Sequence, residues 1–206
     1  MKRIVLAVAL LAIATTATAQ PRVVIGSKNF SESRLLAEIF AQTLEEAGFA
    51  VDRRFDLAGT AVCFRALEGG SIDVYPEYTG TGWVTLLERP AGGSAAEVLA
   101  GVRREFRARF DLEWLAPLGF ENAYEVAVRR AVAAERGLVT IADLAADDEG
   151  LRYAFGFEFQ EREDGLVGLR RAYGLDPAEL VNMQQTLKYA AAGDGAVDVL
   201  DVYTTD

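Results

Sequence analysis

The sequence predicts an α/β fold built as two lobes, and three observations support this prediction. After residue 20, short apolar runs alternate with amphipathic segments, which is the pattern of a parallel sheet with helical crossovers. The segment GGSIDVY at 69–75 is echoed by GDGAVDV at 193–199, so each half should hold a similar unit. Between the halves, residues 115–120 place a proline and a glycine in a short extended segment, as a crossing between lobes does. The expected lobes are 20–117 and 118–206.

The first lobe is expected to open with a strand and a helix. Val-Val-Ile at 23–25 is a continuous apolar run, and the loop 26–30 follows it. Ser31 should cap a helix that reaches residue 47 and stops at Gly48. The apolar face of this helix is expected to contain Leu35, Leu36, Ile39, Phe40 and Leu44.

The rest of the first lobe continues the alternation. Residues 72–75 (IDVY) should form a short buried strand, which Pro76 ends because proline has no N–H for a ladder. The other expected elements are a strand at 49–57, a helix at 60–67, a helix from Gly82, and an amphipathic helix at 95–110.

The second lobe shows the same alternation. Its expected elements are strands at 123–128, 151–155, 180–183 and 197–203, helices at 140–144, 166–173 and 187–192, and a loop rich in aromatic and charged residues at 155–165.

Residues 1–19 have the features of a secretory signal peptide. A basic start, Met1-Lys2-Arg3, precedes an apolar stretch at 4–14 and the small residues Ala-Thr-Ala at 17–19. Cleavage is expected before Gln20. No later apolar run is long enough to span a bilayer, so no stable membrane insertion is expected.

Composition excludes several classes of function. With 31 acidic against 21 basic residues, the chain lacks the basic footprint that nucleic acids require. It contains no histidine, and therefore lacks the commonest general base and metal ligand. Cys63 is the single cysteine and lies in an apolar stretch, where a buried, inert thiol is expected. Neither a metal nor a cofactor is predicted.

Seven candidate binding residues follow strand ends or lie just beyond the crossing. They are Lys28, Tyr78, Thr81, Asn122, Tyr124, Arg162 and Tyr203. Aromatic rings suit a quaternary ammonium group, whereas Arg and Lys suit a carboxylate. A zwitterion fits both sets. From the residues alone, Lys28 could instead be a solvated loop lysine, Arg162 a partner of nearby acids, and Tyr124 a core residue.

Three motifs resemble those of a known family. Gly-Ser-Lys-Asn-Phe at 26–30, Asp-Val-Tyr-Pro-Glu-Tyr-Thr-Gly-Thr at 73–81 and Asp-Val-Tyr-Thr-Thr-Asp at 201–206 are similar to signatures of solute-binding proteins from osmoprotectant ABC importers. Those proteins bind glycine betaine, carnitine, choline or proline betaine in the periplasm. The resemblance implies a type II-like clamshell that closes on the ligand and delivers it to permease subunits.

The resemblance also implies roles for individual residues. Tyr78, Tyr124 and Tyr203 would surround the ammonium group, and Lys28, Thr81 and Arg162 would lie near the carboxylate. Family members normally continue beyond the last strand, return to the first lobe and supply another aromatic residue. The chain is therefore expected to lack that return to lobe 1.

Two other functions stay open at this point. One is a secreted sensory or regulatory lobe that reports the same solute. The other is a hydrolase that uses carboxylates such as Asp73 and Glu77, although the absence of histidine, paired cysteines and a metal site favours a protein without enzymatic activity.

Overall fold

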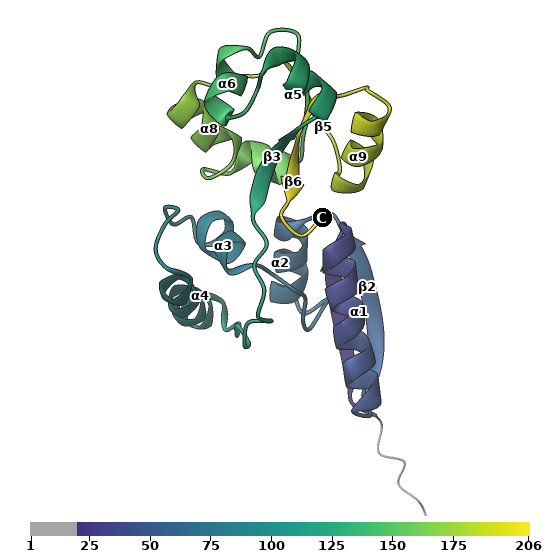
Figure 1. Ribbon diagram of the computed structural model, residues 1–206. Helices are drawn as coiled ribbons and strands as arrows, with labels where there is room; N and C mark the ends of the chain where they lie inside the picture. The colour runs from purple at the N-terminus through teal and green to yellow at the C-terminus, as the bar shows by residue number, and fades with distance from the viewer. Residues whose placement is uncertain (1–19) are drawn as a thin grey trace, which may run out of the picture.

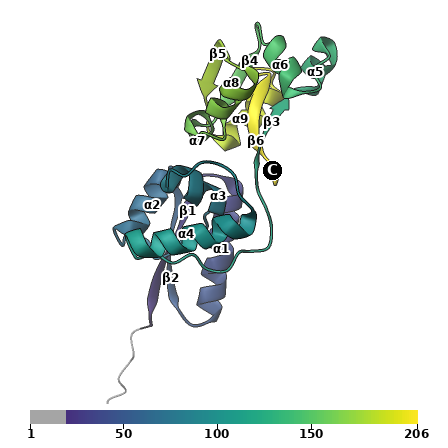
Figure 2. The ribbon, with the colours of Figure 1, turned by 90° about the vertical axis from the view of Figure 1, so that its left-hand side faces the viewer.

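The computed structural model describes residues 20–206, which form two α/β units joined by an extended segment (Figures 1 and 2). The predicted signal peptide lies outside the described residues. Residues 111–123, between the last helix of the first unit and the first strand of the second, include the predicted boundary at 117/118. Within the described part of the chain, we find no helix with the length and apolar character needed to cross a membrane.

The first unit is organised around two parallel strands. β1 (Arg22–Lys28) pairs with β2 (Ala50–Leu57), and α1 (Ser31–Glu46) makes the crossover between them. The core beneath α1 consists of Ile25, Ala37 and Ala41, all fully buried. α2 (Thr60–Glu68) follows β2 directly. β1 ends at Lys28, whose Nζ lies 2.8 Å from Oγ1 of Thr60, the first residue of α2.

The prediction for the apolar face of α1 was wrong in part. Leu35 and Ile39 are 61% and 50% exposed, whereas the buried positions are Ser33, Ala37 and Ala41. Small residues allow the helix to lie close to the sheet, and Phe40 and Leu44 pack against this core as predicted, whereas Leu35 and Ile39 do not. Ser31 is the first helical residue and not the cap; Phe30 occupies the cap position.

The predicted strand at 72–75 is not formed. The segment makes an isolated bridge between Val74 and Ile25, held by a 2.8 Å hydrogen bond from Gly26 N to Val74 O and one of 2.7 Å from Asp73 N to Val24 O. Pro76 follows two residues later and has no N–H for a further ladder bond. The segment is nevertheless placed beside β1, so that Tyr78 comes close to Lys28.

A second layer of helices completes the first unit. α3 (Thr79–Thr81) passes directly into a π-helical turn, η1 (Gly82–Leu86), where an ordinary helix was expected. α4 (Ala95–Phe110) begins at a capping box made by Ser94 and Glu97, and confirms the helix predicted there. Leu87, Val102 and Phe106 form the core between these helices.

The second unit contains a four-stranded mixed sheet. The strand order is β3-β6-β4-β5; β4 is parallel to both β5 and β6, whereas β3 is antiparallel to β6. The antiparallel edge strand departs from the all-parallel sheet that the alternation predicted. The elements of this unit are β3 (Tyr124–Val128), α5 (Arg130–Arg136), α6 (Ile141–Ala146), β4 (Arg152–Phe155), α7 (Phe157–Glu161), α8 (Leu166–Tyr173), β5 (Glu179–Asn182), α9 (Gln185–Gly193) and β6 (Val199–Tyr203).

Two short helices of the second unit were not predicted. α5 follows β3 after a single residue, and α7 lies inside the segment 155–165 that was expected to be a loop. Helices of five to seven residues are too short to show a clear periodicity. α7 matters for the site, because it points from the second unit toward the start of α2.

Candidate functional site

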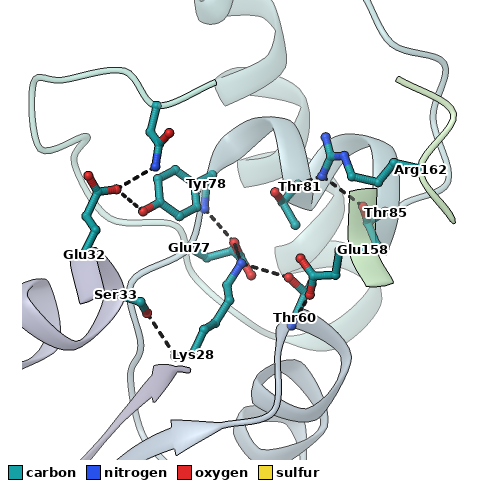
Figure 3. Close-up of polar contacts among 11 residues, drawn as sticks. Lys28, Glu32, Ser33, Thr60, Glu77, Tyr78, Thr81, Thr85, Glu158 and Arg162 are labelled. Carbon is teal, nitrogen blue, oxygen red and sulfur yellow. Dashed lines mark hydrogen bonds and ion pairs between the residues drawn. The ribbon is translucent and has the colours of Figure 1, made fainter. Parts of the chain in front are cut away.

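The seven predicted site residues meet at the junction of the two units (Figure 3 shows most of them). One set of contacts links them: Lys28 lies against the Tyr78 ring, Tyr203 packs on Tyr124, and Tyr124 carries the Arg162 guanidinium over its ring. Arg162 in turn contacts Thr81, and Asn122 reaches Tyr78 through Glu32. The fold therefore gathers into one place residues that are spread over the whole chain.

Four aromatic rings form a continuous wall. The ring centroids of Tyr124 and Tyr203 are 5.0 Å apart, those of Phe30 and Tyr203 5.1 Å, and those of Phe30 and Tyr78 6.3 Å. The rings are tilted by 30–52° with respect to one another. Phe30 and Tyr78 belong to the first unit, and Tyr124 and Tyr203 to paired strands of the second. Such a wall presents ring faces from both units, which is what recognition of a cation by π electrons needs.

Lys28 is buried and already paired. Its Nζ donates hydrogen bonds to Oε1 of Glu77 at 2.6 Å and to Oγ1 of Thr60 at 2.8 Å, and lies 5.4 Å from the centroid of the Tyr78 ring. The side chain is 4% exposed, so Lys28 is not a solvated loop lysine. An ammonium group has three N–H donors, which leaves one beyond these two bonds.

Glu32 connects the start of α1 to the second half of the site. Its Oε1 accepts hydrogen bonds from the hydroxyl of Tyr78 and, at 2.8 Å, from Nδ2 of Asn122. Asn122 lies in the segment between the units, 90 positions away. This carboxylate fixes the Tyr78 ring in its place in the wall.

Arg162 follows α7 and is 7% exposed. Its Nε and Nη2 donate to the two carboxylate oxygens of Asp164, both at 2.8 Å, so a local acid does pair with it. Nη1 donates to Oγ1 of Thr81 at 3.1 Å and of Thr85 at 3.2 Å, across the junction. The guanidinium also lies 5.3 Å from the centroid of the Tyr124 ring.

Glu158, on α7, makes a second polar contact across the junction. Its Oε1 accepts a 2.6 Å hydrogen bond from the backbone N–H of Thr60, the first residue of α2. Gly59, at φ 136°, makes room for it, since a Cβ there would lie 2.9 Å from Oε1. Glu158 and Arg162 are four residues apart and both reach the first unit, as Figure 3 shows.

Burial keeps the tyrosine hydroxyls neutral. It is the main cause that raises the pKa of Tyr78, Tyr124 and Tyr203 above the ordinary value. The next cause is the hydrogen bond to Glu32 for Tyr78, the charge of Glu158 for Tyr124, and the neighbouring Tyr124 for Tyr203. A tyrosine hydroxyl is neutral at physiological pH even at its ordinary pKa, and these shifts move ionisation still further away.

Sequence reasoning missed several residues that the structure adds to the site. Phe30 joins two of the tyrosines, and it stands inside the first motif, where its ring was a detectable signal. Glu77 stands inside the second motif and pairs with Lys28. Glu32 and Glu158 carried no such signal, because their contacts are set by the approach of the two units.

Other features of the described residues do not suggest a second site. No group of three or more His, Cys, Asp or Glu side chains within 20–206 could hold a metal ion. Cys63 is fully buried, as expected, and burial raises the pKa of its thiol to about 12. A surface hollow of about 670 Å³ lies beside α4 and shares no residue with the predicted site; its arginines pair with groups of the same chain.

Comparison with known proteins gives a family match and several relatives. Residues 21–206 match the family model described as the substrate binding domain of ABC-type glycine betaine transport system. The chain is 33% identical over 204 residues to the ergothioneine transport permease/ergothioneine binding protein EgtU of Helicobacter pylori, covering 98% of this chain and 36% of that protein. It is 32% identical to the glycine betaine-binding protein YehZ of Escherichia coli (97% and 69%) and 30% identical to the carnitine transport binding protein OpuCC of Listeria monocytogenes (88% and 60%).

Solved structures show the same fold. Apo YehZ from Escherichia coli superposes with a TM-score of 0.55 at 29% identity, over 92% of this chain and 71% of that one. A glycine betaine/carnitine/choline ABC transporter structure gives a TM-score of 0.61 at 24% identity, over 91% and 70%. These likenesses confirm the predicted two-lobed α/β fold. The chain spans between 36% and 69% of the length of the three relatives above.

Proposed function

Because the chain belongs to the family of substrate-binding domains of ABC-type glycine betaine transport systems, we propose that it binds a small quaternary-ammonium solute between its two units. In this proposal it is the extracytoplasmic binding component of an importer, exported by its signal peptide, and hands the solute to permease subunits. Family membership supports transport over a secreted sensor or a hydrolase, and binding without chemical conversion of the ligand is part of the proposal.

The observation that carries the proposal is the ring wall shared by the two units. Phe30 of the first unit meets Tyr203 of the second at a centroid separation of 5.1 Å. Within the units, Phe30 lies 6.3 Å from Tyr78 and Tyr203 lies 5.0 Å from Tyr124. A trimethylammonium group has no N–H to donate and is held by ring faces, each worth about 0.5–2 kcal/mol. Since the rings come from both units, a cation on this wall would stabilise the closed arrangement of the units.

The carboxylate of a zwitterion would find donors beside the wall. The hydroxyls of Thr81 and Thr85 accept from Arg162, so their own O–H groups are free to donate to a ligand. Lys28 has a third N–H beyond its bonds to Glu77 and Thr60. The names of the three relatives contain ergothioneine, glycine betaine and carnitine. Each of these compounds combines a trimethylammonium group with a carboxylate.

One acceptor at the site favours testing hydroxylated ligands as well. Among the described side chains, Oδ1 of Asn122 is buried without a hydrogen-bond donor. A buried acceptor without a donor is unfavourable by about 1–3 kcal/mol. The O–H of choline or carnitine could donate to it, whereas glycine betaine has no donor to offer.

Calorimetric titration tests this function directly. Purified protein should release or absorb heat with at least one of glycine betaine, carnitine, choline, proline betaine and ergothioneine, and the ligand should be recovered unchanged after incubation. Micromolar affinity corresponds to about 8 kcal/mol, which the rings and the carboxylate contacts can supply together. Absence of binding to all five ligands would contradict the proposal, and conversion of a ligand would point to an enzyme.

A further inference from the structure

Glu158 places a negative charge between the two parts of the site that the proposed ligand would occupy. On one side its Oε1 accepts a 2.6 Å hydrogen bond from the backbone N–H of Thr60. The Oγ1 of the same Thr60 accepts a 2.8 Å hydrogen bond from Nζ of Lys28. On the other side α7 borders the ring wall: Phe159, the residue after Glu158, packs on Tyr124 with ring centroids 5.2 Å apart, and Arg162 lies 5.3 Å from the centroid of the same Tyr124 ring. The charge of Glu158 is also the second cause, after burial, that raises the pKa of Tyr124. Glu158 thus lies beside both the expected cation wall and the expected carboxylate donors.

The hydrogen bond of Glu158 lies between the two units and not inside the core of either one. It belongs to α7, a helix of five residues, and its contact reaches 98 positions along the chain to the other unit. α2 has no side-chain cap of its own at Gly59, so the Thr60 amide is a donor that an incoming carboxylate could also use. In the structure described, the carboxylate of Glu158 occupies that donor.

We propose that Glu158 determines selectivity between cationic and zwitterionic quaternary-ammonium ligands. Its carboxylate attracts the ammonium group of either ligand, but it repels the carboxylate of a zwitterion, so the charge of Glu158 and not its contact with Thr60 sets the selectivity. A cation such as choline therefore gains from Glu158, and a zwitterion such as glycine betaine loses part of that gain. This inference rests on the proposed function, since it concerns the same site.

Two substitutions separate the charge of Glu158 from its contact. Glu158→Gln keeps an acceptor oxygen for Thr60 and removes the charge, whereas Glu158→Asp keeps the charge and withdraws it by one methylene from Thr60. Glu161→Gln makes the same change in net charge at an exposed position of α7 and is the matched control. Glu158→Asp also keeps the proposal testable if Glu158→Gln does not fold.

The experiment is a calorimetric titration of the wild type and the three variants with choline and with glycine betaine. Glu158→Gln should weaken choline binding and leave betaine binding unchanged or tighter, so that the ratio of the two Kd values shifts at least tenfold, about 1.4 kcal/mol. Glu158→Asp and Glu161→Gln should stay within threefold of the wild-type ratio. If Glu158→Gln changes both Kd values by the same factor, or if Glu158→Asp shifts the ratio as much, the selectivity role is wrong while the binding function stands. If the wild type binds neither ligand, the proposed function fails and this inference fails with it.

Discussion

Nη1 of Arg162 donates a 3.1 Å hydrogen bond to Oγ1 of Thr81, and this bond joins the two α/β units across 81 positions of the chain. Arg162 leaves α7 in the second unit, and Thr81 ends α3 in the first. With the Glu158–Thr60 bond four residues earlier on α7, it forms a polar clasp beside the ring wall. The position of α7 is therefore coupled to the separation of the two units.

Arg162→Ala should reduce the affinity for glycine betaine at least tenfold more than the affinity for choline. The guanidinium and the Thr81 hydroxyl that it orients are the expected partners of a carboxylate, which choline lacks, and a buried carboxylate without donors is strongly unfavourable. Titration of both ligands checks this, with Arg171→Ala as the control because Arg171 is 70% exposed and pairs with Glu163. Equal losses for the two ligands would show that Arg162 serves the contact between the units and not the ligand.

Tyr203→Leu should weaken binding of any quaternary-ammonium ligand by about 0.5–2 kcal/mol, the value of one cation–π contact. Tyr203 touches both Phe30 and Tyr124, so its ring is the link in the wall. Tyr203→Phe keeps the ring and should bind almost as the wild type does; Tyr173→Leu, at a tyrosine that is 49% exposed, should have no effect. If Tyr203→Phe is as damaging as Tyr203→Leu, the hydroxyl and not the ring face is what matters.

Because of Asp198, the free energy of unfolding of the second unit should depend on pH in the acid range. Hydrogen bonds from Arg152, the largest cause, together with Arg129, lower the pKa of Asp198 to about 2. Because the folded pKa is below the unfolded one, near 4, this contribution is complete above about pH 4 and is lost as the pH falls toward 2. Asp198→Asn should therefore reduce the free energy of unfolding at neutral pH by about 1–3 kcal/mol, at the low end because Arg152 is 42% exposed.

Urea unfolding of the wild type and Asp198→Asn at a series of pH values provides the measurement. The difference between the two proteins should shrink as the pH falls from about 4 to about 2. A difference that stays constant over this range would mean that the ion pairs of Asp198 do not contribute to the pH dependence.

Lys188→Met should destabilise the second unit strongly. Nζ of Lys188 is fully buried and donates to Oδ1 of Asp201 at 2.6 Å and to its backbone oxygen at 2.9 Å. Removing the lysine leaves the Asp201 carboxylate buried without its counter-charge, at about 3–5 kcal/mol. Asp201 also accepts from Gly156 N, the residue before α7, so the clasp should loosen as well. Thermal and urea unfolding measure the effect, and the double variant Lys188→Met/Asp201→Asn should recover part of it; a loss below about 1 kcal/mol for Lys188→Met would contradict this reasoning.

The sequence predicted which residues come together better than it predicted some of the elements around them. Lys28 ends β1, Tyr78 follows the bridge beside β1, and Tyr203 ends β6, and such strand ends gather at one edge of a sheet. Tyr124 begins β3 and joins them because β3 is antiparallel to β6 and pairs Tyr124 with Tyr203. The helix α4 was also predictable, since its amphipathic pattern is a local property of the sequence, and the structure adds a capping box at Ser94 and Glu97.

The features that were missed depend on distances between segments remote in sequence. α1 buries Ala37 and Ala41 most deeply, and not Leu35 and Ile39, because its closeness to the sheet favours small side chains at the centre of its inner face. The contact of Glu158 with Thr60 exists because α7 meets α2, and no local pattern records that meeting. The parallel sheet predicted for the second unit is mixed, because β3 enters antiparallel to β6 from the connecting segment.

The most direct test of the ring wall compares glycine betaine with its carbon isostere, in which a tert-butyl group replaces the trimethylammonium group. The two ligands share shape and carboxylate and differ in the positive charge. If the rings of Tyr78, Tyr124 and Tyr203 bind a cation, calorimetry should give glycine betaine at least tenfold higher affinity, since about three cation–π contacts of 0.5–2 kcal/mol each depend on that charge. Equal affinity for the two ligands would mean that the wall is only an apolar surface, and would contradict recognition of a quaternary ammonium group by the aromatic rings.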